Sequence, residues 1–443
     1  MDGKYNVAVV GGACAGSEMA SQLVDAGMEV VVFEQNPLPY GKIEDGLPRW
    51  HKKMQDKECA KIDGKMSRDG VQFVPQCRLG YDLKPQDLID EWGFQMVVLA
   101  NGAWRDRPLG IPGSEKITDQ SIAYQNPFVY WFNHYEDANY NGPHFTVPPG
   151  AAVIGGGLAS LDVVKIFQFE LVKNALKERG LDCDVVEMEH HGIHATLKEH
   201  DLTWEGLGIK PARLFYRKRV GDMPLVPLGD DPTPEKLERA VKTREKLINN
   251  GITKYGFEVF QLHSPAEVHV DNGSLVSVSF DLMEPTDKGF RKTGGQARIE
   301  IPFLISSVGS LPEALPGIPM QGDLYDWHNE FTGEVTGMQQ FYCVGNAITG
   351  RGNIKESLQN ARRLGVVVNA GVAGEEPDYA ALFRAAEEEA RAHVQRLIGF
   401  LKAMPEATEA SRALVRAKVT AQHQTLGYSS YTEWRDSVLA QRE

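Results

Sequence analysis

Cysteine is scarce in this chain of 443 residues, which has only five cysteines. They lie far apart and form no C-x-x-C pair, so the sequence offers neither a redox-active disulfide of that type nor the spacing that binds an iron–sulfur cluster. We therefore expect reduced structural thiols and no metal centre. The cysteines are Cys14, Cys59, Cys77, Cys183 and Cys343.

Long apolar runs and an excess of positive charge are also lacking. No run reaches the length of a membrane span, and an expected strand has begun by Val7, which leaves no room for a signal peptide. We therefore expect a cytoplasmic protein with no membrane partner. The formal net charge of −13 argues against nucleic acid as a partner and would suit a basic docking protein. The length predicts two ordinary domains and a remainder.

The most informative feature that is present is a pair of glycine-rich turns. Each lies where a buried strand is expected to end and an amphipathic helix to begin: residues 11–16 follow the strand 6–10, and residues 155–160 follow the apolar run from Ala151. Free N–H groups and the positive end of the helix dipole meet at such a junction, which suits a pyrophosphate. Two such turns predict two bound dinucleotides, with hydride transfer between them.

The first turn is part of a complete dinucleotide-binding pattern. A strand at 6–10, a helix at 17–25 and a second strand at 29–33 are followed by Glu34, and an acid at that place accepts hydrogen bonds from ribose hydroxyls. Ala13 replaces the middle glycine of G-x-G-x-x-G. We expect the backbone to approach the phosphate slightly less closely there.

Three later segments extend this first unit. A buried strand at 96–103 contains Asn101 and Gly102, and a turn-rich crossover at 107–113 reads as a domain boundary. Further strands are expected at 301–308 and 341–347, before a helix at 354–365. Such a helix start, aimed at a polar ring, would stabilise negative charge developing on that ring.

These segments resemble a known group of proteins. Residues 5–34, 96–113 and 301–365 look like the FAD-binding half of two-dinucleotide flavoproteins. The run P-Y-G-K-I-E-D-G-L-P at 39–48 is similar to the flavin-wrapping loop of adrenodoxin reductase and of the glutamate synthase small subunit. Glu44 stands where those relatives often carry a basic residue, and Asn346 replaces their usual Asp. The resemblance covers roughly residues 5–370.

The FAD ligands that this resemblance implies lie in the glycine-rich turns, in the loop or at the strand ends. They are Gly11, Gly12, Ala13, Cys14, Ala15, Gly16, Glu34, Gln35, Gly41, Lys42, Ile43, Asn101, Gly102, Gly309, Gly345, Asn346, Gly352, Asn353 and Ile354.

The second turn resembles the G-x-G-x-x-A-x-D run of the NAD(P)H domain in the same families, but the strand that follows its helix has two candidates. Residues 184–188 end at Glu189, an acid that would favour NAD. Residues 212–216 precede a basic trio, which would pair with the 2′-phosphate of NADP. The run Y-R-K-R with D-M-P at 222–224 is similar to a glutamate synthase small-subunit signature and favours the second placement. The choice between NAD and NADP stays open.

In that placement residues 181–210 form an insertion, for which we expect a polar helical hairpin rather than a metal site, despite its four histidines. The expected NAD(P)H ligands are Gly155, Gly157, Leu158, Ala159, Ser160, Arg217 and Arg219.

The expected fold class is α/β, with two Rossmann-like domains. An FAD domain at 1–106 and 300–375 is interrupted by an NAD(P)H domain at 107–299, in which residues 264–300 alternate like a short antiparallel β-meander. Residues 376–443 have helical spacing and are expected to lie outside the nucleotide-binding unit, as capping or docking helices.

The resemblance implies an FAD-containing NAD(P)H oxidoreductase that exchanges electrons with an iron–sulfur partner protein or subunit, as the flavin subunit of a multi-subunit oxidoreductase. No side chain is expected to act as catalytic acid or base, because placement of the two rings suffices for hydride transfer. Two alternatives remain: a flavin monooxygenase, and a flavin-binding structural subunit with an empty second site.

Overall fold

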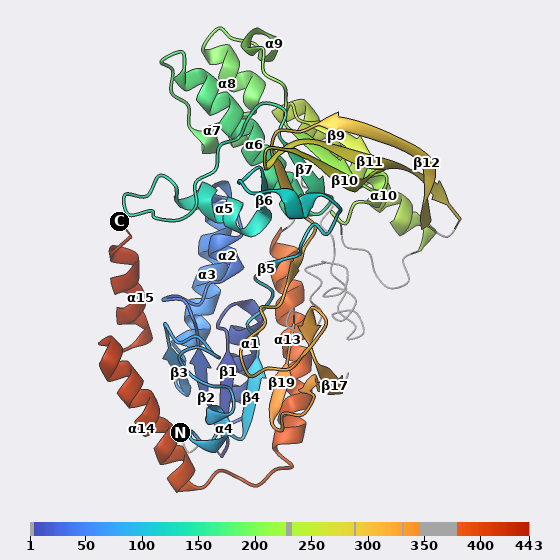
Figure 1. Ribbon diagram of the computed structural model, residues 1–443. Helices are drawn as coiled ribbons and strands as arrows, with labels where there is room; N and C mark the ends of the chain where they lie inside the picture. Colours follow the sequence, from blue (N-terminus) through green and yellow to red (C-terminus); the bar gives the residue numbers. More distant parts are fainter. Residues whose placement is uncertain (1–3, 227–232, 288, 330–331, 346–378, 443) are drawn as a thin grey trace.

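The computed structural model describes residues 4–226, 233–287, 289–329, 332–345 and 379–442, and arranges them as two α/β domains one above the other (Figure 1). Each domain is built on a mainly parallel sheet, which confirms the expected fold class. Within these residues no helix is both long enough and apolar enough to cross a bilayer.

The first domain contains a seven-stranded sheet in the order β17-β18-β19-β4-β1-β2-β3. Its central strands are almost wholly apolar and buried on both faces, as parallel strands between helices are. The strands are β1 (Asn6–Val10), β2 (Glu29–Phe33), β3 (Val71–Val74), β4 (Met96–Leu99), β17 (Trp327–Asn329), β18 (Glu334–Val335) and β19 (Phe341–Cys343). The helices around it include α1 (Cys14–Asp25), α2 (Lys42–Asp45), α3 (Lys52–Met66) and α4 (Asp87–Asp90).

The second domain contains a five-stranded parallel sheet in the order β6-β13-β7-β8-β9. The strands are β6 (Ile122–Tyr124), β7 (Ala152–Gly155), β8 (Arg213–Tyr216), β9 (Glu258–Gln261) and β13 (Leu304–Ser307). Its helices include α5 (Gln125–His134), α6 (Leu158–Lys177) and α10 (Pro234–Tyr255).

The strand expected at 301–308 was assigned to the wrong sheet. Leu304 pairs with Ala152 and Ser307 with Gly155, so β13 lies beside β7 in the second domain. The chain crosses between the domains through β5 (Arg105–Asp106) and β14 (Ser310–Leu311), which pair antiparallel. The return to the first domain therefore follows β13, rather than preceding it at residue 300.

The expected meander is confirmed as a three-stranded antiparallel sheet, in which β12 is the largely exposed edge. Its strands are β10 (His263–Asp271), β11 (Ser274–Thr286) and β12 (Gly289–Glu300), and a smaller pair is β15 (Met320–Gln321) with β16 (Leu324–Tyr325).

The insertion is helical, as expected, and contains α7 (Val185–His191), α8 (Ile193–Glu199) and α9 (Trp204–Leu207). Asp184 caps α7 by accepting a hydrogen bond from the backbone N–H of Val186 at 2.6 Å. The alternative strand at 184–188 is therefore wrong, and β8 is the strand beside β7.

Three C-terminal helices wrap around the first domain: α13 (Tyr379–Leu401), α14 (Glu409–Leu426) and α15 (Tyr431–Ala440). Figure 1 shows α13 alongside α1, and α14 and α15 along the opposite flank of the domain. Val394 and Leu397 are fully buried in the same apolar cluster as Val7 and Val9. These helices are thus part of the first domain's core, and the expectation that they lie outside the nucleotide-binding unit is corrected.

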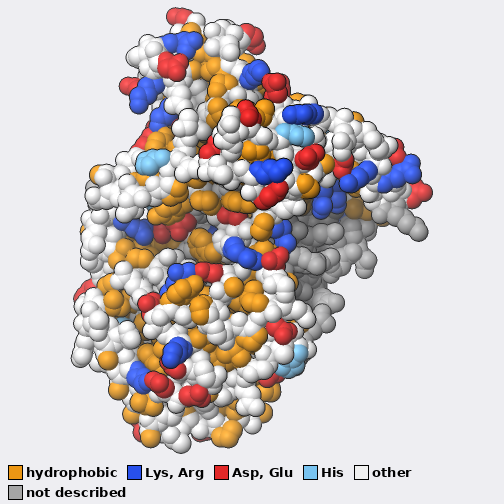
Figure 2. Space-filling view, viewed as in Figure 1, with side chains coloured by type: hydrophobic (Ala, Val, Ile, Leu, Met, Phe, Trp, Pro, Cys, Tyr) orange, Lys and Arg blue, Asp and Glu red, His pale blue; other side chains and the backbone are white. Residues whose placement is uncertain are grey.

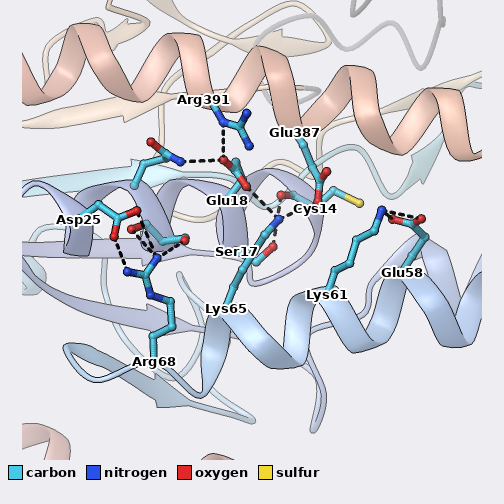
Figure 3. A network of polar contacts seen from close by, with 12 residues as sticks. Cys14, Ser17, Glu18, Asp25, Glu58, Lys61, Lys65, Arg68, Glu387 and Arg391 are labelled. Atoms are coloured by element: carbon cyan, nitrogen blue, oxygen red, sulfur yellow. Dashed lines mark hydrogen bonds and ion pairs between the residues drawn. The ribbon is translucent and has the colours of Figure 1, made fainter.

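A polar network fastens α13 to α1 and α3 (Figure 3). The carboxylate of Glu18, whose residue is 2% exposed, pairs with Lys65 at 2.9 Å and Arg391 at 2.8 Å, and Lys65 also pairs with Glu387 at 2.6 Å. Burial alone would raise the pKa of Glu18, but the hydrogen bonds from Arg391 and Lys65 outweigh it and lower the pKa.

Candidate dinucleotide-binding sites

The first glycine turn joins the end of β1 to the start of α1 in very little space. A Cβ on Gly11 would lie 2.7 Å from the carbonyl oxygen of Ala100, and one on Gly16 would lie 1.8 Å from the carbonyl oxygen of Gly11. Gly11 also has φ +95°, which disfavours other residues. The glycines at these two positions are thus explained by how closely the strand, the helix and β4 approach one another.

A cavity lies beside this turn at the carboxyl ends of the parallel strands, where open α/β sheets bind ligands. It brings together six residues predicted from the sequence, namely Gly11, Ala13, Glu34, Gln35, Gly41 and Asn101. The other lining residues are Val10, Phe33, Cys77, Arg78, Leu79, Ala100, Trp104, Glu313 and Leu315.

Two buried polar atoms on the cavity's lining residues support a bound ligand there. Among the described residues, Asn101 Oδ1 and Arg78 Nε have no hydrogen-bond partner, although Asn101 Nδ2 donates to the hydroxyl of Tyr325 at 2.8 Å and Arg78 pairs with Glu313. Buried polar groups are normally hydrogen-bonded. An acceptor and a charged donor beside the glycine turn fit the polar groups of a dinucleotide such as FAD.

Two backbone amides orient the carboxylate of Glu34. Its Oε2 accepts a hydrogen bond from the N–H of Gly12 at 2.9 Å, and its Oε1 accepts one from the N–H of Asn36 at 3.0 Å. Burial raises the pKa of Glu34. Each carboxylate oxygen has a second lone pair, so the predicted role toward ribose hydroxyls is compatible with these bonds.

The loop after β2 packs directly on the glycine turn. A Cβ on Gly12 would lie 2.5 Å from Cβ of Pro39, and one on Gly41 would lie 3.0 Å from Cβ of Ala13. The side chain of Ile43 is buried in the domain core. The loop therefore forms one wall of the site, with Gly41 rather than Ile43 facing the cavity.

Lys42 extends from this loop toward the strands that cross between the domains. Its Nζ donates to Ser310 Oγ at 2.9 Å and to Asn126 Oδ1 at 3.2 Å. Burial lowers the pKa of Lys42 to about 8, against the opposing effect of Asp106. Burial also raises the pKa of Asp106 to about 6. Lys42, predicted as a cofactor ligand, thus has polar protein partners of its own.

The second turn is equally tight on the sheet side. A Cβ on Gly155 would lie 2.4 Å from the carbonyl oxygen of Ser307, and one on Gly156 would lie 2.3 Å from the ring of Tyr216. At Gly157 no described atom lies within 4 Å of that position. Ser160 is buried, and its hydroxyl donates to Ser307 Oγ at 2.9 Å, so its side chain joins α6 to β13.

The basic trio follows β8, at the place where the favoured alternative put it. Arg217 is exposed, whereas Arg219 Nε donates to Asp222 Oδ2 at 2.8 Å. Lys218 and Arg219 lie 5.7 and 5.8 Å from the ring centroid of Phe290, at the start of β12. Both arginines are exposed, and they differ in that Arg219 already has an acidic partner in Asp222.

Two further predicted glycines lie at strand ends. Gly309, with φ +103°, follows β13, and Gly345, with φ +59°, follows β19 and faces Ala15 at the start of α1. Other predicted FAD ligands lie outside the described residues, namely Asn346, Gly352, Asn353 and Ile354.

A second cavity, of about 310 Å³, lies between α6, α7, α10 and the start of α13 and was not predicted. In it Lys165 pairs with Glu189 at 2.6 Å, and the hydroxyl of Tyr379 donates to Asp162. His51 Nε2 lies 3.6 Å from Asp162 Oδ1. Figure 2 shows a hollow with charged and apolar side chains between the two domains. No sequence motif marks this cavity, because its residues come from separate elements.

Comparison with known proteins supports the expected resemblance. The family described as pyridine nucleotide-disulphide oxidoreductase matches residues 5–191. NADPH:adrenodoxin oxidoreductase of Arabidopsis thaliana is 27% identical over 55% of this chain and 51% of its own length. The glutamate synthase [NADPH] small chain of Mycobacterium tuberculosis is 30% identical over 38% of this chain and 36% of its own length. The chain thus spans about half of the length of the first of these curated relatives and about a third of the second.

A solved structure, FprA of Mycobacterium tuberculosis in complex with NADPH, matches 95% of this chain and 90% of its own. The TM-score is 0.64 and the identity 20%. This likeness confirms the fold over nearly the whole chain.

Proposed function

We propose that this chain, whose residues 5–191 match the pyridine nucleotide-disulphide oxidoreductase family, is a flavin-dependent NAD(P)H oxidoreductase. One observation carries the proposal: two glycine turns, each at the carboxyl end of a parallel sheet and each opening a long helix, occur in one chain. Each turn presents amides and a helix dipole to one place.

The first site is assigned to FAD and the second to NADP(H). The backbone at Gly11–Ala13, the carboxylate of Glu34, and the side chains of Asn101 and Arg78 would hold FAD in the first cavity. The backbone at Gly155–Ala159 and the exposed guanidinium of Arg217 would hold the second dinucleotide. Both curated relatives are named with NADPH, and FprA is in complex with it, which favours NADPH over NADH.

FAD, when bound, accepts a hydride and gives up electrons singly. The residues of this chain bind and orient, and none is assigned as acid or base. We propose that, among the described residues, the FAD domain is formed by residues 4–106 and by those from β14 onward, with the NADP(H) domain between them.

The proposed electron acceptor is an iron–sulfur protein or subunit in the cytoplasm. Two observations support it: the cysteines have no cluster spacing, and the relatives are named as an adrenodoxin oxidoreductase and as the small chain of a larger synthase. The chain would then act as the flavin subunit of a multi-subunit oxidoreductase.

Anaerobic titration of the purified, FAD-reconstituted chain tests the proposal. Bound FAD should give the visible absorbance bands of a flavin. NADPH should bleach these bands stoichiometrically, and NADH should be less effective. A colourless chain after reconstitution, or a yellow chain that neither nucleotide bleaches, would contradict the assignment. Reoxidation by a ferredoxin under anaerobic conditions tests the partner class.

A further inference from the structure

The last helix of the chain, α15, contacts the loop that packs on the first glycine turn. The indole N–H of Trp434 donates to the carbonyl oxygen of Pro37 at 2.8 Å, although the two residues are 397 positions apart. At the other end of the loop, Arg442 pairs with Glu44. The contacts thus reach both ends of the segment 37–44.

Asp63, on α3, connects the helix to the middle of the loop. Its Oδ1 accepts hydrogen bonds from the hydroxyls of Tyr40 at 2.9 Å and Tyr431 at 2.6 Å, and its Oδ2 lies 3.4 Å from Arg435. Burial raises the pKa values of both tyrosines, so both hydroxyls stay protonated and donate at neutral pH. A half-buried carboxylate with several donors is a strong anchor.

Apolar packing holds the helix in place behind these polar contacts. Tyr431 is 5% exposed, and its ring meets Phe73 edge-on with centroids 5.3 Å apart. Tyr431 belongs to the same buried cluster as Leu38, Tyr40 and Ile43 of the loop. The side of α15 that faces the domain is therefore fixed to the loop, because both contribute side chains to one apolar cluster.

Glu44 joins the end of the loop to the last residues of the chain. Its carboxylate pairs with the guanidinium of Arg442, which lies just beyond the end of α15. Pro39 and Gly41, which lie between the attached points, contact Gly12 and Ala13. Whatever fixes the loop therefore also fixes that wall of the FAD site.

We propose that α15 is a clasp that holds the flavin-wrapping loop closed, so that Tyr431, Trp434 and Arg442 act as positioning residues for FAD retention. This inference rests on the proposed function, because the retained group is the FAD of that proposal.

The main test compares the full chain with one ending at Gly427, each reconstituted with FAD, by following the fluorescence of released flavin after dilution. Loss of the hydrogen bonds and packing of α15 should speed FAD release about tenfold or more. Tyr431→Phe keeps the ring and removes the hydroxyl, and should give a smaller increase in a fully folded chain. Thr432→Ala, on the exposed face of the same helix, is the matched control and should release FAD like the full chain.

The ion pair is tested by reversing its charges. Glu44→Arg and Arg442→Glu should each raise the FAD dissociation constant about threefold, and the double variant should restore it, as expected for an exposed pair. Arg442 would not be part of the clasp if the single variants had the FAD dissociation constant of the unchanged protein. The same would follow if the double variant bound FAD no more tightly than the single variants.

A readout without FAD separates this inference from the proposed function. In flavin-free protein, amide hydrogen exchange in residues 37–46 should be about tenfold faster in the truncated chain than in the full chain. If both chains exchange and release FAD equally, the clasp is wrong. If the full chain binds no FAD at all, the proposed function fails, whereas the exchange experiment still decides whether α15 holds the loop.

Discussion

At the scale of single residues, the glycines divide into those that have no room for a methyl group and those that do. Gly16→Ala would place a Cβ 1.8 Å from the carbonyl oxygen of Gly11, so we expect it to lower the free energy of unfolding by about 3 kcal/mol or more. A Cβ on Gly64, in α3, would meet no described atom within 4 Å beyond its chain neighbours and its own helix backbone, and Gly64→Ala should stabilise the folded protein by about 1 kcal/mol. Urea unfolding of both variants gives the comparison, and equal effects would contradict the packing argument.

The two arginines after β8 are expected to differ in their effect on coenzyme choice. Arg217→Ala should raise the KM for NADPH about tenfold or more and leave that for NADH unchanged, because it removes a charged donor to the 2′-phosphate. Arg219→Ala should have a smaller effect, since its guanidinium already bonds Asp222. Steady-state kinetics with ferricyanide as electron acceptor measure both. Arg291→Ala, on the exposed meander, is the control; an equal loss with NADPH and NADH would remove Arg217 from the phosphate site.

Asp106 should give the folded protein a specific pH dependence. Burial raises the pKa of its carboxyl from 3.8 to about 6, so between these values the folded state binds more protons than the unfolded state. The contribution of this group to stability is therefore present at low pH and is lost as pH rises through about 6. Asp106→Asn should flatten this part of the curve, by on the order of 1 kcal/mol after solvent screening. Unfolding of both proteins from pH 4 to 7 tests this, and parallel curves would contradict it.

Residue patterns predicted part of the first cavity and missed the rest for a physical reason. Gly11, Glu34 and Asn101 lie in or directly after strands that the sequence marks by buried apolar runs, and the cavity brings them together. Cys77 and Arg78 follow β3, a four-residue strand without a distinctive pattern. Trp104 and Glu313 reach the site only through the crossing of the chain between the domains, which local patterns do not encode.

At the scale of elements, the ion pairs that help to attach α13 to α1 centre on the buried carboxylate of Glu18. Glu18→Ala leaves Lys65, whose side chain is 17% exposed, with a single acidic partner, Glu387. Breaking a partly buried ion network in this way should cost about 2–3 kcal/mol of folding free energy. Glu409→Ala removes an exposed carboxylate on α14 and should change stability by less than about 1 kcal/mol. Thermal unfolding measures the stability that each of the two variants loses. Similar melting temperatures would show that the buried network contributes little to stability.

The bounds of helices and strands were predicted better than the elements with which they pair or pack. Asn6–Val10 and Glu29–Phe33 have the predicted bounds, and the C-terminal apolar spacing is helical. Leu304–Ser307 was placed in the wrong sheet, because a short apolar strand reads alike in either parallel sheet. The spacing of Val394 and Leu397 shows that one face of α13 is buried, but not that α1 and the core of the first domain cover it.

At the scale of the whole molecule, each of the two proposed dinucleotide sites should stabilise the folded chain when its ligand is bound. A ligand at 100 times its dissociation constant adds about 2.7 kcal/mol to the folded state. We therefore expect FAD and NADPH each to raise the melting temperature of the flavin-free chain, with larger effect together. Calorimetry tests this, with Arg217→Ala as a variant in which the NADPH increment alone should shrink. An unchanged melting temperature with FAD would contradict the first assignment.

The pairing of β5 with β14 brings the two connections between the domains side by side. Asp106 and Ser310 are direct neighbours across that ladder, so the chain leaves the first domain and re-enters it at nearly the same point. A few linking residues would bridge the gap if the intervening segment were cut out, and the excised piece would begin and end side by side. Exchanging the second domain between related chains would therefore place both junctions at this one ladder, and would also have to preserve the packing of Leu47, Trp50 and Tyr379, which belong to the second domain's apolar cluster.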